Sequence, residues 1–368
     1  MRFAQLLVAA ATTLGVSISA AAAAPPTYTL TDIGQLGGGY TQAYGINASG
    51  WITGVSYAGN QPRAFLFDGV SMTNLGTLGG TSSTGYAINN AGTVAGSSAP
   101  NGQYSRGFSY SSGVMTNIGS FSGTYSESNA INTSGTIAGW SGVSGGGAVP
   151  VTWAGGTMTS LGSFGGSNGY AWGINDSGQA TGNSYLAGDN AHRAFRYTNG
   201  VMTNLGTFGG TNSEGLDINN NGAVTGWAQN GNNTQTAFIA TGNTIVSLGT
   251  FGYASRGIAI NDQGWVVGKS MDQAFTDRAF VYDGTAMFDL NTLIATSDPL
   301  YGQITLASAT GITESGLIIA NSGTRAFLLT PVVATTDTPE PATLALLATG
   351  LFGLVAARRR TTGPARLA

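Results

Sequence analysis

The chain has 368 residues, of which 59 are glycine and none is cysteine; charged residues make up 8% and aromatic residues 10%. The aromatic content and the small formal net charge of -3 argue against disorder, and the lack of cysteine excludes disulfides and thiolate metal sites. Residues 25 to 357 hold all 16 acidic residues but only eight of the 13 basic ones, which disfavours a nucleic-acid role because phosphate binding needs a basic face.

The first 24 residues have the composition of a secretory signal peptide. Arg2 provides a short positive region, residues 6 to 19 are almost wholly apolar, and the run from Ala20 to Ala24 offers several small-residue cleavage sites. A buried helix is the other interpretation of this segment. We expect cleavage within the alanine run, so that the mature protein begins near Pro25.

A repeat of about 42 residues organises everything between this signal and the C-terminal tail. Its marker is an Ile-Asn-x-x-Gly sequence whose asparagines are spaced by 42 to 44 residues, and Thr313 takes the seventh place after a gap of 52. The marker asparagines are Asn47, Asn89, Asn132, Asn175, Asn219 and Asn261. A segment related to Arg-Ala-Phe follows each marker, and a segment related to Met-Thr-Asn-Leu-Gly then follows in all but the seventh case, which gives seven units.

Each unit predicts four short strands. In the first strand, small residues such as Ala43 and Gly45 alternate with larger ones such as Tyr44 and Ile46, which predicts a strand pressed against neighbouring sheets. The Asn-x-x-Gly sequence is typical of a type I turn, so a second strand follows at once. The Arg-Ala-Phe and Met-Thr-Asn segments supply the third and fourth strands.

Repeated four-stranded units of about 40 to 50 residues are typical of β-propeller blades. The seventh unit stops after its third strand at 325–331, and segment 27–34 aligns with the fourth strand of the first unit at 70–76. The sequence therefore predicts an all-β fold over residues 25–331, a β-propeller of seven four-stranded blades closed by an N-terminal strand. A β-solenoid is the alternative, and it would more simply begin and end on capping units.

Over residues 27 to 331 the units resemble the extracellular HAF repeats, which carry a His-Ala-Phe tripeptide before an aromatic-rich strand. The Ala-Phe pair, the Gly-Ile-Asn-x-x-Gly sequence and the Asn-Leu-Gly-Thr-Leu-Gly-Gly sequence all match. Arginine stands in place of the histidine at Arg63, Arg193, Arg278 and Arg325, and Arg106 precedes Gly-Phe. The resemblance implies secretion and a repeated β fold, and says little about activity.

Residues suited to catalysis or metal binding are few, and the sequence predicts no catalytic residue, no metal site and no cofactor. His192 is the one histidine; Asp189 lies near it in sequence, but no nucleophile-elbow motif accompanies them, so we interpret His192 as a turn residue. No calcium-binding loop motif occurs. Asp68 and Asp283 precede glycines in equivalent turns and are interpreted as turn residues.

One position of the repeat is polar and variable on an otherwise uniform strand. It lies five residues before each marker, where the innermost strand begins, and is occupied by Gln42, Thr84, Glu127, Tyr170, Glu214, Arg256 and Ser308. In a propeller these residues would ring one mouth of the central channel. We take Gln42, Glu127, Tyr170, Glu214 and Arg256 as candidates for a ligand rim; a solvated rim without a ligand explains the same variation and is the simpler interpretation.

Six tryptophans raise the possibility of carbohydrate binding, because flat aromatic faces stack on sugar rings. Trp153 replaces a third-strand phenylalanine and is expected in the core, whereas Trp51 and Trp265 begin second strands. Trp140 and Trp227 follow the second glycine of their units. Packing within or between sheets is the preferred interpretation for each.

The C-terminal segment combines a linker with a Pro-Glu-Pro triplet (332–341), an uncharged stretch (342–357) and a basic tail (358–368). We interpret the 16 uncharged residues as a transmembrane helix followed by a cytoplasmic tail. At 1.5 Å per residue this helix would span about 24 Å, a marginal length for the roughly 30 Å hydrocarbon core, helped by arginines that can extend to the interface. Pro339, Glu340 and Pro341, followed by an apolar helix and then Arg358, Arg359 and Arg360, resemble the PEP-CTERM sorting signal of Gram-negative bacteria. The resemblance implies recognition by an exosortase, a membrane cysteine protease, and a link to exopolysaccharide; a plain C-terminal anchor is the alternative.

Together these features predict a secreted protein that is delivered to the cell surface or extracellular matrix through a membrane-anchored precursor, with transient contact with the inner membrane. We expect a structural or binding role linked to exopolysaccharide and no enzymatic activity. A carbohydrate-binding surface lectin and an extracellular hydrolase are the two alternatives.

Overall fold

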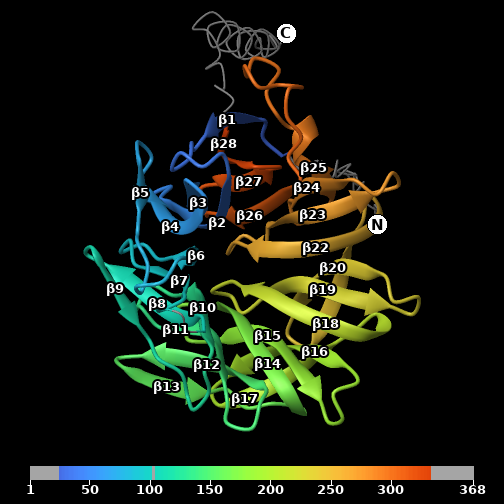
Figure 1. Ribbon diagram of the computed structural model, residues 1–368. Coiled ribbons are helices and arrows are strands. Elements are labelled where there is room, and N and C mark those ends of the chain that lie inside the picture. Colours follow the sequence, from blue (N-terminus) through green and yellow to red (C-terminus); the bar gives the residue numbers. More distant parts are fainter. Residues whose placement is uncertain (1–24, 102–103, 333–368) are drawn as a thin grey trace, which may run out of the picture. The chain divides into compact units, whose positions relative to one another are not determined.

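The computed structural model describes residues 25–101 and 104–332 of the chain (Figure 1). These residues form 28 β-strands and one short 3-10 helix. The predicted signal peptide, sorting triplet, membrane segment 342–357 and basic tail lie outside the described residues. Within the described residues, no helix is both long enough and apolar enough to cross a bilayer.

The strands form antiparallel four-stranded sheets in chain order. The first strands are β2 (Thr41–Ile46), β6 (Ser83–Ile88), β10 (Ser126–Ile131), β14 (Gly165–Ile174), β18 (Gly209–Ile218), β22 (Gly252–Ile260) and β26 (Ser308–Ile312). The second strands are β3 (Ile52–Ala58), β7 (Val94–Ser98), β11 (Ile137–Gly142), β15 (Ala180–Leu186), β19 (Val224–Asn230), β23 (Val266–Asp272) and β27 (Ile318–Ser322). The third strands are β4 (Gln61–Phe67), β8 (Arg106–Ser111), β12 (Ala148–Ala154), β16 (His192–Thr198), β20 (Gln235–Thr241), β24 (Asp277–Tyr282) and β28 (Arg325–Pro331).

The fourth strands are β5 (Met72–Asn74), β9 (Val114–Asn117), β13 (Thr157–Ser160), β17 (Val201–Gly206), β21 (Thr244–Gly249) and β25 (Met287–Asp289). Five sheets have four strands each, and an eight-stranded sheet consists of two such groups joined where Ala148 of β12 pairs with Asn168 of β14. The prediction of an all-β fold built from four-stranded units is confirmed.

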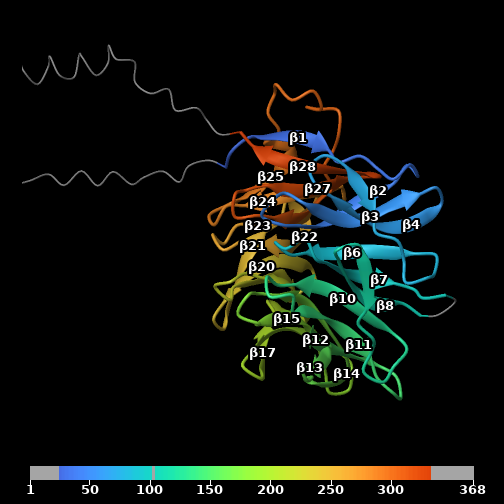
Figure 2. The same cartoon turned by 90° about the vertical axis from the view of Figure 1, so that its left-hand side faces the viewer.

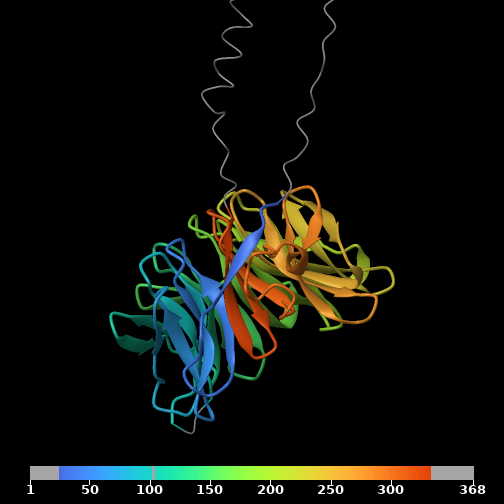
Figure 3. The ribbon, with the colours of Figure 1, turned by 90° about the horizontal axis from the view of Figure 1, so that it is seen from above.

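The sheet of β26, β27 and β28 takes its fourth strand from the other end of the chain. β1 (Tyr28–Asp32) pairs antiparallel with β28, from Tyr28 opposite Pro331 to Asp32 opposite Phe327. Figures 2 and 3 show β1, in blue, alongside the orange-red strands of the last unit. The segment that the sequence marks as a displaced fourth strand therefore lies in that place.

An insertion between β25 and β26 explains the longer spacing of the last unit and secures β1. It contains the 3-10 helix η1 (Leu290–Thr292), and Leu290, Ile294 and Leu306 are buried in one cluster with Tyr28. The amide of Tyr28 donates to the carbonyl of Leu293 at 2.8 Å. The insertion thus covers β1 with both apolar contacts and backbone hydrogen bonds.

The core lies between successive sheets and uses the Ala-Phe pair of five of the third strands; β8 has Gly-Phe and β12 has Pro-Val at this place. Phe65 packs with Ile52 of its own sheet and with Ala326 of the last sheet, whereas Ala64 packs against Phe108 of the next sheet. Because neighbouring residues of a strand point to opposite faces, the pair serves both interfaces. Burying each phenylalanine contributes roughly 1.5–3 kcal/mol.

The close approach of the first strands follows from their small residues, as predicted. A Cβ on Gly45 would lie 2.9 Å from the Cα of Ala87 in the next first strand. The predicted turn is also present: the amide of Gly50 donates to the carbonyl of Asn47 at 2.9 Å, and Gly50 has a φ of +78°. Only glycine adopts that conformation without strain.

Strand boundaries differ from the prediction in the fourth, fifth and sixth units. There the first strand begins before the variable polar position at which we expected it to start, at Gly165, Gly209 and Gly252. The pairing with the second strand shifts register directly after these glycines. Such irregular pairing is typical of glycine in strands.

Candidate functional site

The variable polar position of the first strand lies directly opposite one position of the second strand. Glu127 pairs with Trp140, and Glu214 pairs with Trp227 two units later. Tyr170 pairs with Asn183 in the unit between them. Because directly opposed residues of antiparallel strands hold their side chains on one face of the sheet, three consecutive units present a pair of one polar and one aromatic side chain at the same place.

Two of these pairs are identical carboxylate–indole contacts. Nε1 of Trp140 donates to Oε2 of Glu127 at 3.1 Å, and Nε1 of Trp227 donates to Oε2 of Glu214 at 2.9 Å. Burial raises the pKa of both carboxyl groups, partly offset by the indole hydrogen bonds and, at Glu214, by Arg256. Each indole therefore fixes the direction of a carboxyl group that is protonated more readily than an exposed glutamate.

Aromatic rings fill the space between the two carboxylates. The ring of Tyr170 lies edge-on to Trp140, with centroids 5.5 Å apart, and stacks on Trp172 at 5.8 Å. Nε1 of Trp172 donates to Oδ1 of Asn183 at 3.0 Å. The three rings are each partly exposed, so they form a continuous accessible aromatic surface.

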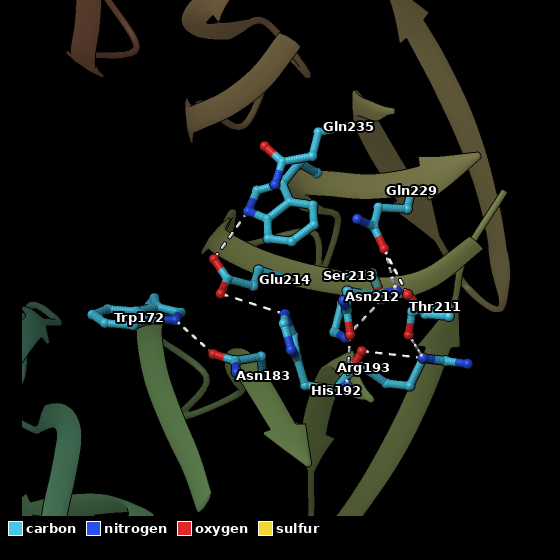
Figure 4. A network of polar contacts seen from close by, with 12 residues as sticks. Trp172, Asn183, His192, Arg193, Thr211, Asn212, Ser213, Glu214, Gln229 and Gln235 are labelled. Atoms are coloured by element: carbon cyan, nitrogen blue, oxygen red, sulfur yellow. Dashed lines mark hydrogen bonds and ion pairs between the residues drawn. The ribbon is translucent and has the colours of Figure 1, made fainter. Parts of the chain in front are cut away.

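His192 extends this surface towards the fifth unit (Figure 4). Its ring lies 5.1 Å from Tyr185 and 5.8 Å from Trp227 between centroids, and its Nε2 lies 3.7 Å from Oε1 of Glu214. Burial and the neighbouring Arg193 lower the pKa of His192. The imidazole is therefore neutral near pH 7, and the contact with Glu214 is polar but is not an ion pair.

Arg256 closes the series at the sixth unit. Its guanidinium lies 5.3 Å from the ring of Trp227, and its Nε donates to Oε1 of Gln235 at 2.8 Å. The opposite residue, Lys269, pairs with Asp277 at 2.6 Å. We name the surface formed by Glu127, Trp140, Tyr170, Trp172, Asn183, His192, Glu214, Trp227 and Arg256 the aromatic belt.

Of the five rim candidates, the structure brings together Glu127, Tyr170, Glu214 and Arg256. Gln42 lies apart from them, because its amide donates to the carbonyls of Thr41 and Gly323. Whether any of them binds a ligand stays a prediction.

Two tryptophans that we expected to pack instead belong to this surface, because Trp140 and Trp172 are partly exposed within the belt. Trp227 is only 5% exposed and lies beneath Arg256, which agrees with the expected packing. The other expectations agree with the structure, since Trp51, Trp153 and Trp265 each pack against a core cluster.

The innermost strands enclose two connected cavities. The wide cavity, of about 560 Å³, is lined by partly apolar walls that include Tyr44, Tyr86, Glu127 and Trp172. The narrow cavity, of about 240 Å³, is lined by residues of all seven units, among them the first five marker asparagines and Thr313. The isoleucines that precede these markers lie at the junction, because Ile46, Ile88, Ile131, Ile174 and Ile312 line both cavities.

The marker asparagines connect successive units around the narrow cavity. Each donates from Nδ2 to the backbone carbonyl of the next marker, from Asn47 to Asn89 and onward to Thr313, at distances of 2.9 to 3.3 Å. The Oδ1 of Asn47 also accepts from the amides of Ser49 and Trp51. The asparagine is therefore both a turn residue and a link between sheets, and the sequence analysis identified only the first role.

The sequence analysis also missed Asp217, which lines both cavities. The equivalent residue is Gly or Ala in the other six units, and that deviation was the signal available in the sequence. Its Oδ2 accepts from the amide of Ile260 at 2.9 Å and its Oδ1 from that of Ile218 at 2.8 Å. Burial raises the pKa of Asp217 to about 7; these two amides oppose the rise and Asp262 adds to it.

The alternative of a Ser-His-Asp triad gains no support from the geometry. Asp189 accepts from the amide of Ser167 at 2.8 Å and from its Oγ at 2.7 Å, and does not contact His192. Within the described residues, Nε2 of His192 makes no hydrogen bond. No group of three or more His, Asp or Glu side chains placed to hold a metal ion occurs in the described part of the chain.

Comparison with known proteins identifies the C-terminal segment. Residues 337–360 match the PEP-CTERM protein-sorting motif, which confirms the prediction made from Pro339–Pro341 and Arg358–Arg360. A motif of this kind implies export, sorting to the cell surface in Gram-negative bacteria and processing by an exosortase. Among curated proteins, none matches the chain.

Solved structures resemble the body of the chain. The β-propeller domain of the Trilobed protease from Pyrococcus furiosus is 10% identical with a TM-score of 0.51, over 87% of this chain and 99% of that one. Puromycin hydrolase is 10% identical with a TM-score of 0.50, over 87% of this chain and 58% of that one. TolB from Acinetobacter baumannii is 13% identical with a TM-score of 0.43, over 83% of this chain and 63% of that one. The chain thus spans less than two thirds of the last two structures. The likeness to the Trilobed protease domain and to puromycin hydrolase shows a propeller-like all-β fold alone.

Proposed function

We propose that this chain is a cell-surface or matrix protein that binds carbohydrate through the aromatic belt, and that its partner is an exopolysaccharide. The sorting motif at residues 337–360 supports the destination. The single observation that carries the binding role is the accessible ring series Trp140, Tyr170 and Trp172 beside oriented carboxyl groups.

The belt offers what a sugar requires. The apolar face of a pyranose ring packs on aromatic faces, and its hydroxyl groups need both donors and acceptors. Glu127 supplies an acceptor that an indole already orients, and Arg256 supplies a donor. Because these groups sit on regular strands, little ordering entropy is lost when a ligand binds.

We infer a seven-bladed propeller in which the last blade contacts the first. Contacts across that junction support closure: Asn321 accepts from the amide of Ala43 at 2.9 Å and donates to its carbonyl at 3.0 Å, and Thr310 donates to the same carbonyl. Narrow-cavity walls drawn from all seven units also favour a ring over the β-solenoid alternative.

We also propose that the units are HAF-type repeats in which arginine has taken a structural role. Nη1 of Arg63 donates to the carbonyl of Thr81, and Nη1 of Arg193 donates to that of Thr211. Both carbonyls lie 18 residues further along the chain, at the start of the next unit. Arg325 pairs with Asp32 and so connects β28 to β1.

The contacts around His192 favour a protein that binds its ligand without catalysing a reaction. A hydrolase of the serine type needs a hydroxyl activated by a base, and the acid nearest to His192 in sequence, Asp189, is engaged by Ser167. A matrix component without a defined ligand is the other candidate, and ligand binding separates the two.

The test is binding of the mature exported protein to a glycan array, followed by titration of the glycans that bind. Tyr170→Ala removes the central ring and should weaken binding roughly tenfold. Tyr253→Ala is the matched control, since Tyr253 is an exposed aromatic residue that contacts Phe275 outside the belt. Equal affinities for both variants, or no glycan bound, would refute the proposed function.

A further inference from the structure

The wide cavity contains a charged residue at a position that the fold elsewhere keeps small. Asp217 stands where Gly45, Ala87, Ala130, Gly173, Ala259 and Gly311 stand in the other units. The fold therefore does not require a carboxylate there, because six equivalent positions pack without one. A carboxylate held away from bulk water is costly unless it is paired, so its presence at a cavity wall calls for a partner.

The protein supplies only part of that pairing. Two backbone amides, of Ile218 and Ile260, donate to the Asp217 carboxylate. The residues lining the two cavities include no lysine, arginine or histidine. The remaining lone pairs of this carboxylate face space that a ligand can enter.

The charges around the cavities all have one sign. Five of the 16 acidic residues of the chain line the cavity walls: Glu127, Asp176, Asp217, Asp262 and Glu314. Cavities lined by one sign of charge within low-dielectric walls concentrate the field and attract the opposite charge. The cavities therefore favour a cation over an anion or a neutral molecule.

The walls of the wide cavity indicate the kind of cation. Tyr44, Tyr86 and Trp172 present aromatic rings to it, and the rings of Tyr44 and Tyr86 lie 6.0 Å apart. Aromatic faces attract cations and pack on carbon groups, whereas a calcium or magnesium ion needs six or more oxygen ligands converging on one point. Its volume of about 560 Å³ falls within the range of small-molecule sites, roughly 300–1,000 Å³.

We propose that the wide cavity binds a small organic ammonium ion, whose charged group lies against Asp217 and whose carbon groups lie against Tyr44, Tyr86 and Trp172. The site is separate from glycan binding in its chemistry, although Glu127 and Trp172 border both. It therefore stands or falls independently of the proposed carbohydrate.

The test is calorimetric titration of the mature exported protein with choline, with 1,5-diaminopentane and with 3,3-dimethylbutanol, the uncharged carbon analogue of choline. We expect at least one of the two ammonium compounds to bind with one-to-one stoichiometry and the alcohol to bind at least tenfold more weakly, as expected for a hydrogen bond or ion pair to a charged group. The proposal would be overturned if neither ammonium compound bound, or if the alcohol bound as tightly as they do. It would also be overturned if calcium ions, added as calcium chloride, bound and neither ammonium compound did.

Asp217→Ala gives this unit the side chain that Ala87, Ala130 and Ala259 have in theirs, so it is expected to fold. It should weaken ammonium binding tenfold or more, whereas Asp68→Asn, which removes a charge from an exposed turn, should leave it unchanged. A second measurement needs no variant. Near pH 6.5, titration in two buffers of different ionisation enthalpy should detect a proton released from Asp217 on binding, with Asp262, Glu127, Tyr44 and Tyr86 as the other titratable groups nearby.

Discussion

We expect the difference in unfolding free energy between Asp217→Ala and wild type to depend on pH. The variant should gain stability relative to wild type when the pH is raised from 4 to 8. Burial raises the pKa of Asp217 from 3.8 to about 7. Since the native state holds this proton more tightly than the unfolded state does, wild-type stability should fall as the pH rises from 4 to 7 and should level off above 7. The alanine variant has no such group and should lose that slope.

The expected size follows from the same pKa. Each pKa unit corresponds to about 1.4 kcal/mol, so a rise from 3.8 to about 7 makes the ionised form up to about 4 kcal/mol less favourable for folding. Water in the wide cavity reduces this figure, which is therefore an upper bound. The variant also loses hydrogen bonds to the amides of Ile218 and Ile260. These bonds favour the ionised form, so the part of their contribution that depends on pH is already included in the pKa of about 7.

The assay is urea unfolding of both proteins at half-unit pH steps from 4 to 8, followed by tryptophan fluorescence. Free energies extrapolated to water give the wild-type minus variant difference at each pH. Asp68→Asn is the control. The amides of Ser71 and Val70 lower the pKa of Asp68 from 3.8, so its stabilising contribution is present above the unfolded pKa and is lost only as the pH falls below this assay range. The difference between wild type and Asp68→Asn should therefore stay nearly constant between pH 4 and pH 8.

A flat difference between wild type and Asp217→Ala across this range would refute the reasoning. It would mean that the wide cavity hydrates the carboxylate as well as bulk water does. A slope of the opposite sign would mean that the two amides outweigh burial. Either result would also remove the premise that Asp217 needs a cationic partner.

Three further predictions concern the fold and the belt. Asn132→Ala removes hydrogen bonds within a turn and to the next unit and should cost about 2–4 kcal/mol of unfolding free energy, whereas exposed Asn232→Ala should cost less than about 0.5 kcal/mol. Equal losses in urea titrations would contradict the role of Asn132 as a link between sheets. Burial raises the pKa of Glu127, and its carboxylate accepts a hydrogen bond from Trp140. Tryptophan fluorescence should therefore change with pH above pH 4.5, and Glu127→Gln should remove part of that change. An unchanged pH profile in the variant would contradict the coupling of Glu127 to Trp140. Deleting residues 25–34 removes β1 and should lower the melting temperature steeply or prevent folding, measured by calorimetry; an unaltered transition would show that the last sheet is stable with three strands.

Much of the architecture follows directly from repetition in the sequence. Because one pattern occurs seven times, each element can be assigned from several copies rather than from one. The Asn47-to-Gly50 turn, the Ala64–Phe65 pair and the displaced strand 28–32 could therefore be predicted from the sequence alone. A comparison of the units also conceals a residue that differs in only one of them. Asp217 falls within a matching marker sequence and was missed, because the pattern records what the units share.

Side-chain contacts between strands and between units were harder to predict from the sequence. The polar variable position predicted Glu127 and Glu214, but their tryptophan partners lie 13 residues away on the second strand, where packing was the simpler interpretation. The contact between His192 and Glu214 joins neighbouring sheets. Nothing in a periodic pattern fixes which side chains of adjacent sheets meet.

The sequence by itself determined the strand order, the turns, the apolar faces and the terminal address at residues 337–360, because each depends on local chain geometry or on a short contiguous motif. The tertiary structure decided which side chains share a surface and how far each is removed from water. Burial and proximity are properties of several sheets at once, and they alone give Asp217 its raised pKa and assemble the aromatic belt around Tyr170.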